Sequence, residues 1–377
     1  MASQSPQNFS FSRSFLLSPL GWPYLLTPFI PAAVAFEVAH LEPTIVFAAS
    51  ALGIIPTAAL MGRATEELAA RSGPGIGGLL NVTFGNAPEL IIALFALNAG
   101  LHEVVKASLI GSILGNILLV MGAAMFLGGL GREKQTFSRT SANAQTSMLL
   151  LAAMALMMPA IFQLIEGSGL PSPGAEHVEF GSTVEHLSLA VAIVLILTYV
   201  GGLVFSLRTH KDLFNPPYEE EEDTLGWSVR GSMIALAIAG IAVGVMSEVL
   251  VSSITEASET IGLSEFFIGV IIVAIVGNAA EHWVAVLVAM KNKMDLAVNI
   301  SIGSSAQIAL FVAPVLVICS FILGDPMPLV FNGFELGAVL ATVLIANYVT
   351  QEGESNWFEG LQLLALYAIL ALTFYFA

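Results

Sequence analysis

Apolar runs long enough to cross a lipid bilayer recur along this chain from one end to the other. About 20 residues of α-helix span the hydrocarbon core of a membrane. Of the 377 residues, 56% are hydrophobic and 11% are charged, whereas soluble domains carry roughly 25% charged residues. The sequence therefore predicts an all-α polytopic membrane protein. It predicts eleven transmembrane helices, near residues 22–40, 43–62, 75–99, 104–128, 144–165, 187–207, 228–251, 265–290, 296–323, 328–349 and 357–376.

The basic residues gather on one side of this eleven-helix plan. Lys and Arg near short loops mark the cytoplasmic side of a membrane protein, whereas acidic residues contribute little. Lys106 alone falls on the other side, and the remaining basic residues are Arg13, Arg63, Arg71, Arg132, Lys134, Arg139, Arg208, Lys211, Arg230, Lys291 and Lys293. We therefore expect a cytoplasmic N-terminus and a C-terminus on the opposite side. The lack of a long N-terminal extension favours a prokaryotic plasma (inner) membrane.

Acidic residues carry the formal net charge of −16. They concentrate in loops, at residues 217–223 on the predicted inside and at 166–185 and 255–265 on the outside. Such loops repel nucleic acid and concentrate cations near the mouths of a membrane protein. Membrane lipid and small cations are therefore the expected partners, with no nucleic acid, and the sequence leaves a homo-oligomer open.

The chain contains an internal repeat. "IGGLLNVTFGNAPE" at 76–89 is echoed by "IGVIIVAIVGNAAE" at 268–281, and the same offset of 192 residues places "IGS" at 110–112 on "IGS" at 302–304. The second copy begins five predicted helices after the first, so it crosses the membrane in the opposite direction. The sequence thus predicts an N-terminal segment with one helix (1–42), a first repeat (43–210), an acidic cytosolic linker (211–227) and an inverted second repeat (228–377).

Glu89 and Glu281 occupy equivalent positions near the middle of the third and eighth predicted helices. A charged carboxylate at the bilayer centre costs at least about 2.5–3.5 kcal/mol, and intramembrane ionisable residues are functional by default. The alternative for a single buried Glu is a hydrogen bond between helices. Two Glu at duplicated positions favour a functional site instead.

The residues around both glutamates indicate a site for a hard cation. Pro88 cannot donate a helical hydrogen bond and its ring displaces the carbonyl four residues earlier, so we expect the helix to unwind around Gly85. Gly277 should produce a milder version of this in the second copy. Two carboxylates and freed carbonyl oxygens suit Ca²⁺, whereas no Cys or His pair offers ligands for a softer metal.

Further polar residues flank the predicted site. Asn81 shares a helix face with Gly85 and Glu89. Each of these residues, taken singly, is as readily explained by ordinary hydrogen bonds between membrane helices. The predicted supporting set is Asn81, Asn86, Ser112, Asn116, Asn278, His282, Ser304 and Gln307.

The segments "GNAPELI" (85–91) and "GNAAEHW" (277–283) resemble the paired signature regions of the cation/proton exchangers of the calcium:cation antiporter superfamily. That family exchanges calcium for protons in microbes, vacuoles and plants. The sodium/calcium exchangers of the same superfamily usually carry a hydroxyl residue after the Gly, whereas both copies here read Gly-Asn-Ala. One departure is Pro88, where many members have Thr or Val.

The resemblance implies roles for particular residues. It assigns Glu89 and Glu281 as Ca²⁺ ligands, with carbonyls near Gly85 and Gly277, and no cofactor. His282, Ser304 and Gln307 match the second signature region. An acidic segment that senses or attracts Ca²⁺ in the family is matched by Glu219, Glu220, Glu221, Glu222 and Asp223. The alternative for this segment is an ordinary solvated loop.

A pair of buried carboxylates also predicts how transport is coupled. The two groups repel each other and lose hydration, so they should hold at least one proton when no metal is bound, and they titrate as a unit. Only a carrier loaded with Ca²⁺ or protons should change its facing, which makes it an antiporter and not an enzyme. Glu89 and Glu281 would then couple the protons. The alternatives are sodium/calcium or other monovalent-cation exchange and, less favoured, a cation channel.

Overall fold

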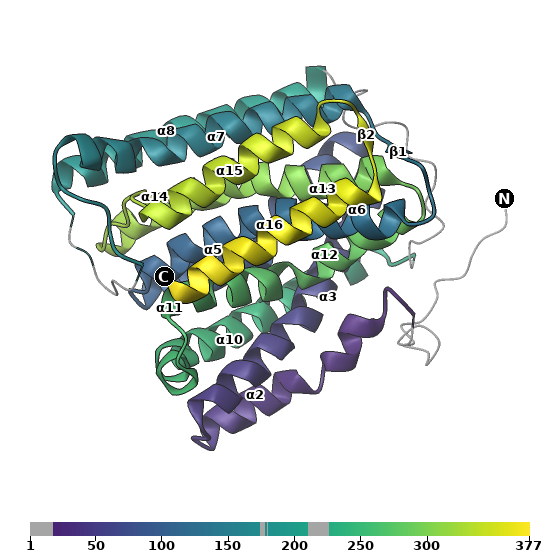
Figure 1. Ribbon diagram of the computed structural model, residues 1–377. Helices are drawn as coiled ribbons and strands as arrows, with labels where there is room; N and C mark the ends of the chain where they lie inside the picture. Colours follow the sequence, from purple (N-terminus) through teal and green to yellow (C-terminus); the bar gives the residue numbers. More distant parts are fainter. Residues whose placement is uncertain (1–17, 174–177, 179, 210–225) are drawn as a thin grey trace.

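The computed structural model of the protein describes residues 18–173, 178, 180–209 and 226–377, and it shows a bundle of long helices (Figure 1). The acidic segment 219–223 lies outside the described residues. In chain order the helices are η1 (Trp22–Leu26), α2 (Phe29–Val38), α3 (Pro43–Phe84), α4 (Ala87–Asn98), α5 (His102–Leu114), η2 (Gly115–Met121), α6 (Gly122–Gly129), α7 (Arg139–Ile165), α8 (Ser182–Val204), η3 (Phe205–Thr209), α10 (Val229–Ile261), α11 (Glu265–Phe267), η4 (Ile268–Val273), α12 (Ala274–Met290), α13 (Met294–Gln307), η5 (Ile308–Val312), α14 (Ala313–Leu323), α15 (Gly333–Thr350) and α16 (Trp357–Phe376).

Nine helical segments within the described residues are long and apolar enough to cross a membrane. They cover 43–72, 102–129, 139–165, 182–209, 229–261, 265–290, 294–323, 333–350 and 357–376. The predicted span 22–40 is divided into η1 and α2, with Pro23 and Pro28 at their starts. The predicted span 75–99 is divided between the end of α3 and the shorter α4. A helical membrane protein is thus confirmed, while the count of eleven helices stays a prediction.

The helical run of α3 includes the predicted helix 43–62 and the first part of the predicted helix 75–99, between which the sequence predicts a loop. A Cβ atom on Gly77 would lie 2.4 Å from the carbonyl oxygen of Ala69. Eight residues of straight α-helix span about 12 Å, so the run bends sharply between these two residues. The bend replaces the loop expected between the second and third helices, and it sends the chain back toward the middle of the bundle.

Wider π-helical turns interrupt several long helices. Two of them, η2 and η5, begin at Gly115 and Ile308, which are 193 residues apart. This spacing is close to the 192-residue offset of the repeated motifs. Because π-helical turns are rare and frequently lie at functional sites, their matched positions point to the helices that carry Ser112 and Ser304.

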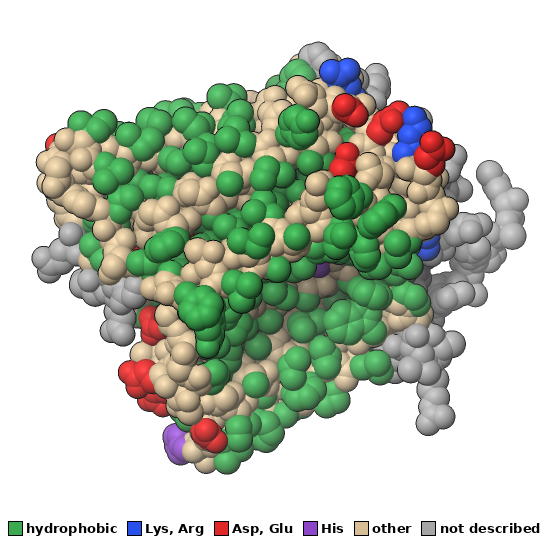
Figure 2. All heavy atoms as spheres, in the orientation of Figure 1, with side chains coloured by type: hydrophobic (Ala, Val, Ile, Leu, Met, Phe, Trp, Pro, Cys, Tyr) green, Lys and Arg blue, Asp and Glu red, His purple; other side chains and the backbone are tan. Residues whose placement is uncertain are grey.

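The two ends of the bundle differ. At one end, β1 (Gln135–Thr136) pairs antiparallel with β2 (Glu354–Ser355), and the C-terminus lies at the opposite end (Figure 1). We call these the sheet end and the C-terminal end. The Lys and Arg side chains visible in Figure 2 lie at the sheet end, and hydrophobic side chains cover most of the face between the ends. Beside the strands, the Glu354 carboxylate hydrogen-bonds Lys134 at 2.8 Å and raises the pKa of that ammonium group.

Candidate ion-binding site between the two repeated motifs

The first motif breaks its helix as the sequence predicts. α3 ends at Phe84, Gly85 and Asn86 form a turn, and α4 begins at Ala87 with Pro88 in its first turn. Proline is tolerated there because the first turn of a helix has no internal partner for its N–H groups. Glu89 also lies in this first turn, where the positive end of the helix dipole favours a carboxylate.

The second motif does not unwind, which corrects the expectation for Gly277. α12 runs without interruption from Ala274 to Met290, and its backbone stays helical through Gly277 and Asn278. Ala280 replaces the proline and can donate its N–H to the helix, so nothing forces a break. The irregular segment is η4, which ends directly before α12. Helix interruption therefore exposes carbonyl groups in the first motif only.

The two motifs cross at their glycines. A Cβ atom on Gly85 would lie 3.5 Å from Glu281 Oε1, and a Cβ atom on Gly277 would lie 3.5 Å from Glu89 Cγ. Each glutamate side chain therefore lies beside the glycine of the other motif, and the two carboxylates are near enough for their negative charges to repel. Residues 192 positions apart in the sequence meet here at a single place in the fold.

Four hydrogen bonds connect the motif residues to the helices that follow each motif. In each of them a predicted supporting residue is one of the partners. The bonds are Asn86 Nδ2 to Gln307 Oε1 (2.6 Å), Asn278 Nδ2 to Ser112 Oγ (3.2 Å), Ser304 Oγ to Glu281 Oε2 (3.2 Å), and His282 Nε2 with Asn116 Oδ1 (3.0 Å). Three of the four join one half of the chain to the other, so both halves build one site.

Three buried oxygens at this crossing have no hydrogen-bond partner among the described residues. They are Asn86 Oδ1, Glu89 Oε2 and Asn278 Oδ1. Buried polar atoms in proteins nearly always have a hydrogen-bond partner. Three unpaired oxygens from both motifs therefore indicate a place for a cation that binds oxygen ligands. A small cavity of about 10 Å³ lies beside Glu89, and its lining is Glu89, Ile92, Ser108, Ser112, Val273 and Ala274.

Two observations depart from the predicted residue set. Asn81 is exposed and takes no part in the buried contacts just described, so its place in a cation pathway stays a prediction. Ser108 lines the cavity although sequence reasoning missed it. The available signal was its position one helical turn before Ser112 on the same face of α5.

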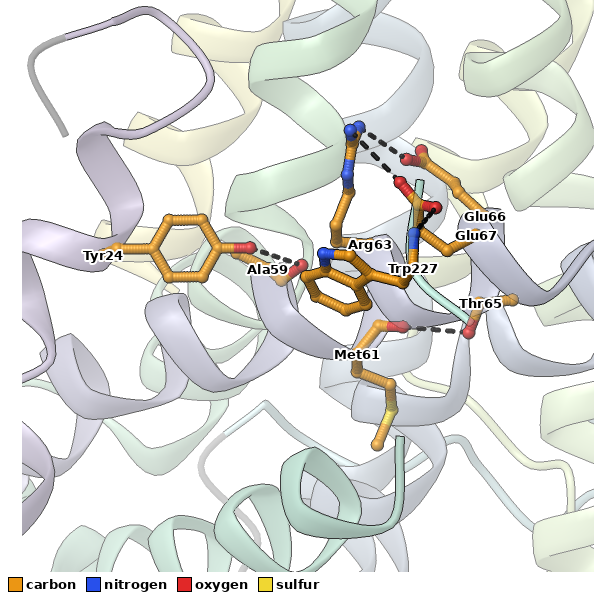
Figure 3. A network of polar contacts seen from close by, with 8 residues as sticks. All are labelled: Tyr24, Ala59, Met61, Arg63, Thr65, Glu66, Glu67 and Trp227. Atoms are coloured by element: carbon orange, nitrogen blue, oxygen red, sulfur yellow. Dashed lines mark hydrogen bonds and ion pairs between the residues drawn. The ribbon is translucent and has the colours of Figure 1, made fainter. Parts of the chain in front are cut away.

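A second polar network lies on α3 and involves the residue that precedes α10 (Figure 3). Arg63 pairs with Glu66 at 3.6 Å and with Glu67 at 3.5 Å, and the backbone N–H of Trp227 donates to Glu67 Oε2 at 3.1 Å. Trp227 directly precedes α10, and α3 and α10 make the most extensive helix–helix contact in the described structure. The network therefore ties the two helices together close to where the acidic linker ends.

Comparison with known proteins identifies the family of the chain. The sequence matches the family described as sodium/calcium exchanger protein over residues 42–208 and 231–376. It is 47% identical to a Ca²⁺/H⁺ antiporter of Synechocystis sp., over 93% of this chain and 96% of that protein. It is 46% identical to the Ca²⁺/H⁺ antiporter ChaA of Bacillus subtilis, over 92% of this chain and 96% of that protein.

A solved structure has the same fold. The chain superimposes on native YfkE with a TM-score of 0.80 and 42% sequence identity, over 94% of this chain and 100% of that chain. A second structure of YfkE describes that protein as a Ca²⁺/H⁺ antiporter. The chain therefore belongs to the sodium/calcium exchanger protein family, and its resemblance to the calcium/proton exchangers of that superfamily is confirmed.

Proposed function

We propose that this protein exchanges Ca²⁺ for H⁺ across a membrane, with Glu89 and Glu281 as the shared binding groups. The observation that carries the proposal is the crossing of the two motifs, where each glutamate lies against the opposite glycine. Ca²⁺ takes oxygen ligands from carboxylates and from amide carbonyls. Both carboxylates and the unpaired amide oxygens of Asn86 and Asn278 offer that chemistry. The names of the relatives point the same way.

The coupling follows from the charge of the site. An empty site would hold two carboxylates inside the hydrocarbon region, which is unfavourable. Bound Ca²⁺ or bound protons neutralise the pair, so the loaded forms are those that change their facing. Because the two carboxylates titrate together, the protons belong to the pair and not to either residue.

The same proposal includes eleven membrane crossings and alternating access. The N-terminal segment precedes two inverted repeats, residues 43–210 and 228–377, joined by the acidic linker. The first part of α3 and its counterpart α10 are the elements that move against the rest. By the distribution of Lys and Arg, the sheet end faces the cytoplasm and the C-terminal end faces outward. A prokaryotic plasma membrane is the proposed location.

Transport in sodium-free proteoliposomes tests the function. Vesicles with an acidic interior should take up Ca²⁺ when they contain the protein, because outward proton movement drives the exchange. Collapsing the pH gradient with an ionophore should stop the uptake. Uptake that requires a sodium gradient would support sodium/calcium exchange instead, and single-channel currents in a planar bilayer would support a cation channel.

A serine pair gives a finer test of the ligand set. Ser304→Ala removes the donor to Glu281 Oε2. A hydrogen bond to a charged group contributes roughly 1.5–3 kcal/mol, so the Ca²⁺ concentration for half-maximal uptake should rise about tenfold or more. Ser305→Ala is the matched control, because its hydroxyl donates to the Ser301 carbonyl of its own helix at 2.9 Å and not to a glutamate in the described structure. Equal half-maximal concentrations for the two variants would remove Ser304 from the site.

A further inference from the structure

Lys106 is a fully buried lysine in a membrane protein, with 0% of its surface exposed. Its ammonium group lies 2.5 Å from Glu103 Oε1 and donates to the Val330 carbonyl oxygen at 2.8 Å. It also lies 5.3 Å from the centre of the Phe180 ring, close enough for a cation–π interaction. A buried ammonium is unfavourable unless it is paired in this way, so these contacts hold the lysine and its partners together.

The partners of Lys106 come from separate parts of the chain. Lys106 and Glu103 lie on α5, Val330 lies between α14 and α15, and Phe180 precedes α8. The carboxylate of Glu335, in the first turn of α15, is buried and interacts electrostatically with Lys106. Lys106 therefore fastens the first turns of α5 to the start of α15 at the C-terminal end of the bundle.

The equivalent junction at the sheet end has a valine, Val298, at the position of Lys106. The 192-residue offset places Lys106 on Val298 and Glu103 on Asp295, and it places Ser138 on Val330. There the Asp295 carboxylate accepts a hydrogen bond directly from the Ser138 backbone N–H. In both junctions an acidic residue near the start of a helix is joined to the backbone of an equivalent residue, Val330 or Ser138. In the first junction the link runs through the Lys106 side chain, and in the second it is direct.

The helix that Lys106 fastens also closes one side of the ion site. A Cβ atom on Gly111 would lie 2.0 Å from the Val270 carbonyl oxygen, and one on Gly269 would lie 3.0 Å from the Val104 carbonyl oxygen. We call this contact between α5 and η4 the α5–η4 seal. Ser108 and Ser112 of α5 line the small cavity beside Glu89, so the position of α5 sets both the cavity wall and the seal.

We propose that Lys106 is a positioning residue for the exchange, because it holds α5 where the α5–η4 seal closes the ion site from the C-terminal end. This inference rests on the proposed function, since it assigns to a buried charge the task of keeping the site closed on one side. Because Val298 occupies the equivalent position of the second repeat, the two junctions are held in different ways.

Chemical labelling of the full-length protein in intact cells tests this role. In a Cys319→Ala background, Ser108→Cys places a thiol in the cavity wall, and a charged, membrane-impermeant maleimide is added from outside. Adding Lys106→Met should raise the labelling rate at least about tenfold, because the seal then opens locally more often. Lys106→Arg keeps the cation and its donors and should restore slow labelling. Val298→Met, at the equivalent position of the sheet end, is the matched control and should leave the rate unchanged.

The outcomes separate positioning from general stability. Folded Lys106→Met protein with an unchanged labelling rate would overturn the proposal, even if its thermal midpoint were lower. Should that variant fail to fold, Glu103→Gln with Lys106→Met removes both buried charges together and is judged by the same rates. The labelling needs no ion transport. A lack of pH-driven Ca²⁺ uptake by the unaltered protein would therefore refute the proposed function without deciding this test.

Discussion

Replacement of Glu281 by Gln is expected to abolish pH-driven Ca²⁺ uptake in proteoliposomes. The variant keeps the shape of the side chain but removes a carboxylate that faces Gly85 and interacts with the charge of Glu89. In the proposed site the lost carboxylate is one of two charged partners of Ca²⁺. Truncating one partner of a buried charge pair costs about 2–5 kcal/mol, so we expect a loss of Ca²⁺ affinity on the order of 100-fold. Isotopic Ca²⁺ uptake and equilibrium Ca²⁺ binding to purified protein both measure this change.

The same loss is expected for Glu89→Gln, because the two carboxylates form one site. Glu256→Gln is the matched control, since this glutamate is exposed near the end of α10 and lies outside the site. The control should transport at the rate of the unaltered protein. If either Glu89→Gln or Glu281→Gln transported Ca²⁺ at that rate, the paired-glutamate mechanism would be wrong.

The sequence singled out the residues that meet at the motif crossing because these residues belong to short, repeated patterns. A Gly-Asn-Ala motif that recurs at a fixed offset needs no knowledge of packing, and Pro88 breaks its helix through local chemistry alone. The expected unwinding at Gly277 was wrong for the same local reason. Ala280 restores the N–H that proline lacks, so a glycine alone does not break a helix that its neighbours support.

Contacts between distant residues could not be read from the sequence. That Asn86 bonds Gln307 while Asn278 bonds Ser112 depends on how the four helices cross. The equivalent asparagines of the two repeats bond residues at non-equivalent positions. An offset of 192 residues therefore does not predict these pairs. The burial of Lys106 was equally hidden, because a lysine near the end of a predicted helix normally extends to the membrane surface.

Gly111→Ala is the second change with a large expected effect. The added methyl group would lie 2.0 Å from the Val270 backbone oxygen, so α5 and η4 must move apart. Overpacking of this kind typically costs 1–3 kcal/mol, and a backbone neighbour has little freedom to yield. We expect a lower thermal midpoint and Ca²⁺ uptake reduced at least about tenfold. Gly201→Ala in α8 is the control, since among the described residues nothing beyond its own stretch of helix lies within 4 Å of the added group. An unaltered rate and midpoint for Gly111→Ala would mean that the α5–η4 seal is dispensable.

Gly303, which lies 192 residues after Gly111, tests whether the two repeats exchange roles. A Cβ atom there has Gln145 Oε1 as its nearest neighbour at 3.7 Å, an ordinary contact, so Gly303→Ala should leave the thermal midpoint unchanged. In the opposite-facing state of the proposed alternating-access cycle, however, Gly303 would approach residues 76–81 as closely as Gly111 approaches η4 in this structure. Gly303→Ala should then slow Ca²⁺ uptake about tenfold without loss of stability, because it disfavours only the state that is not seen here. Uptake at the unaltered rate would exclude a symmetric exchange of the two seals and would require that the sheet end close by a different contact.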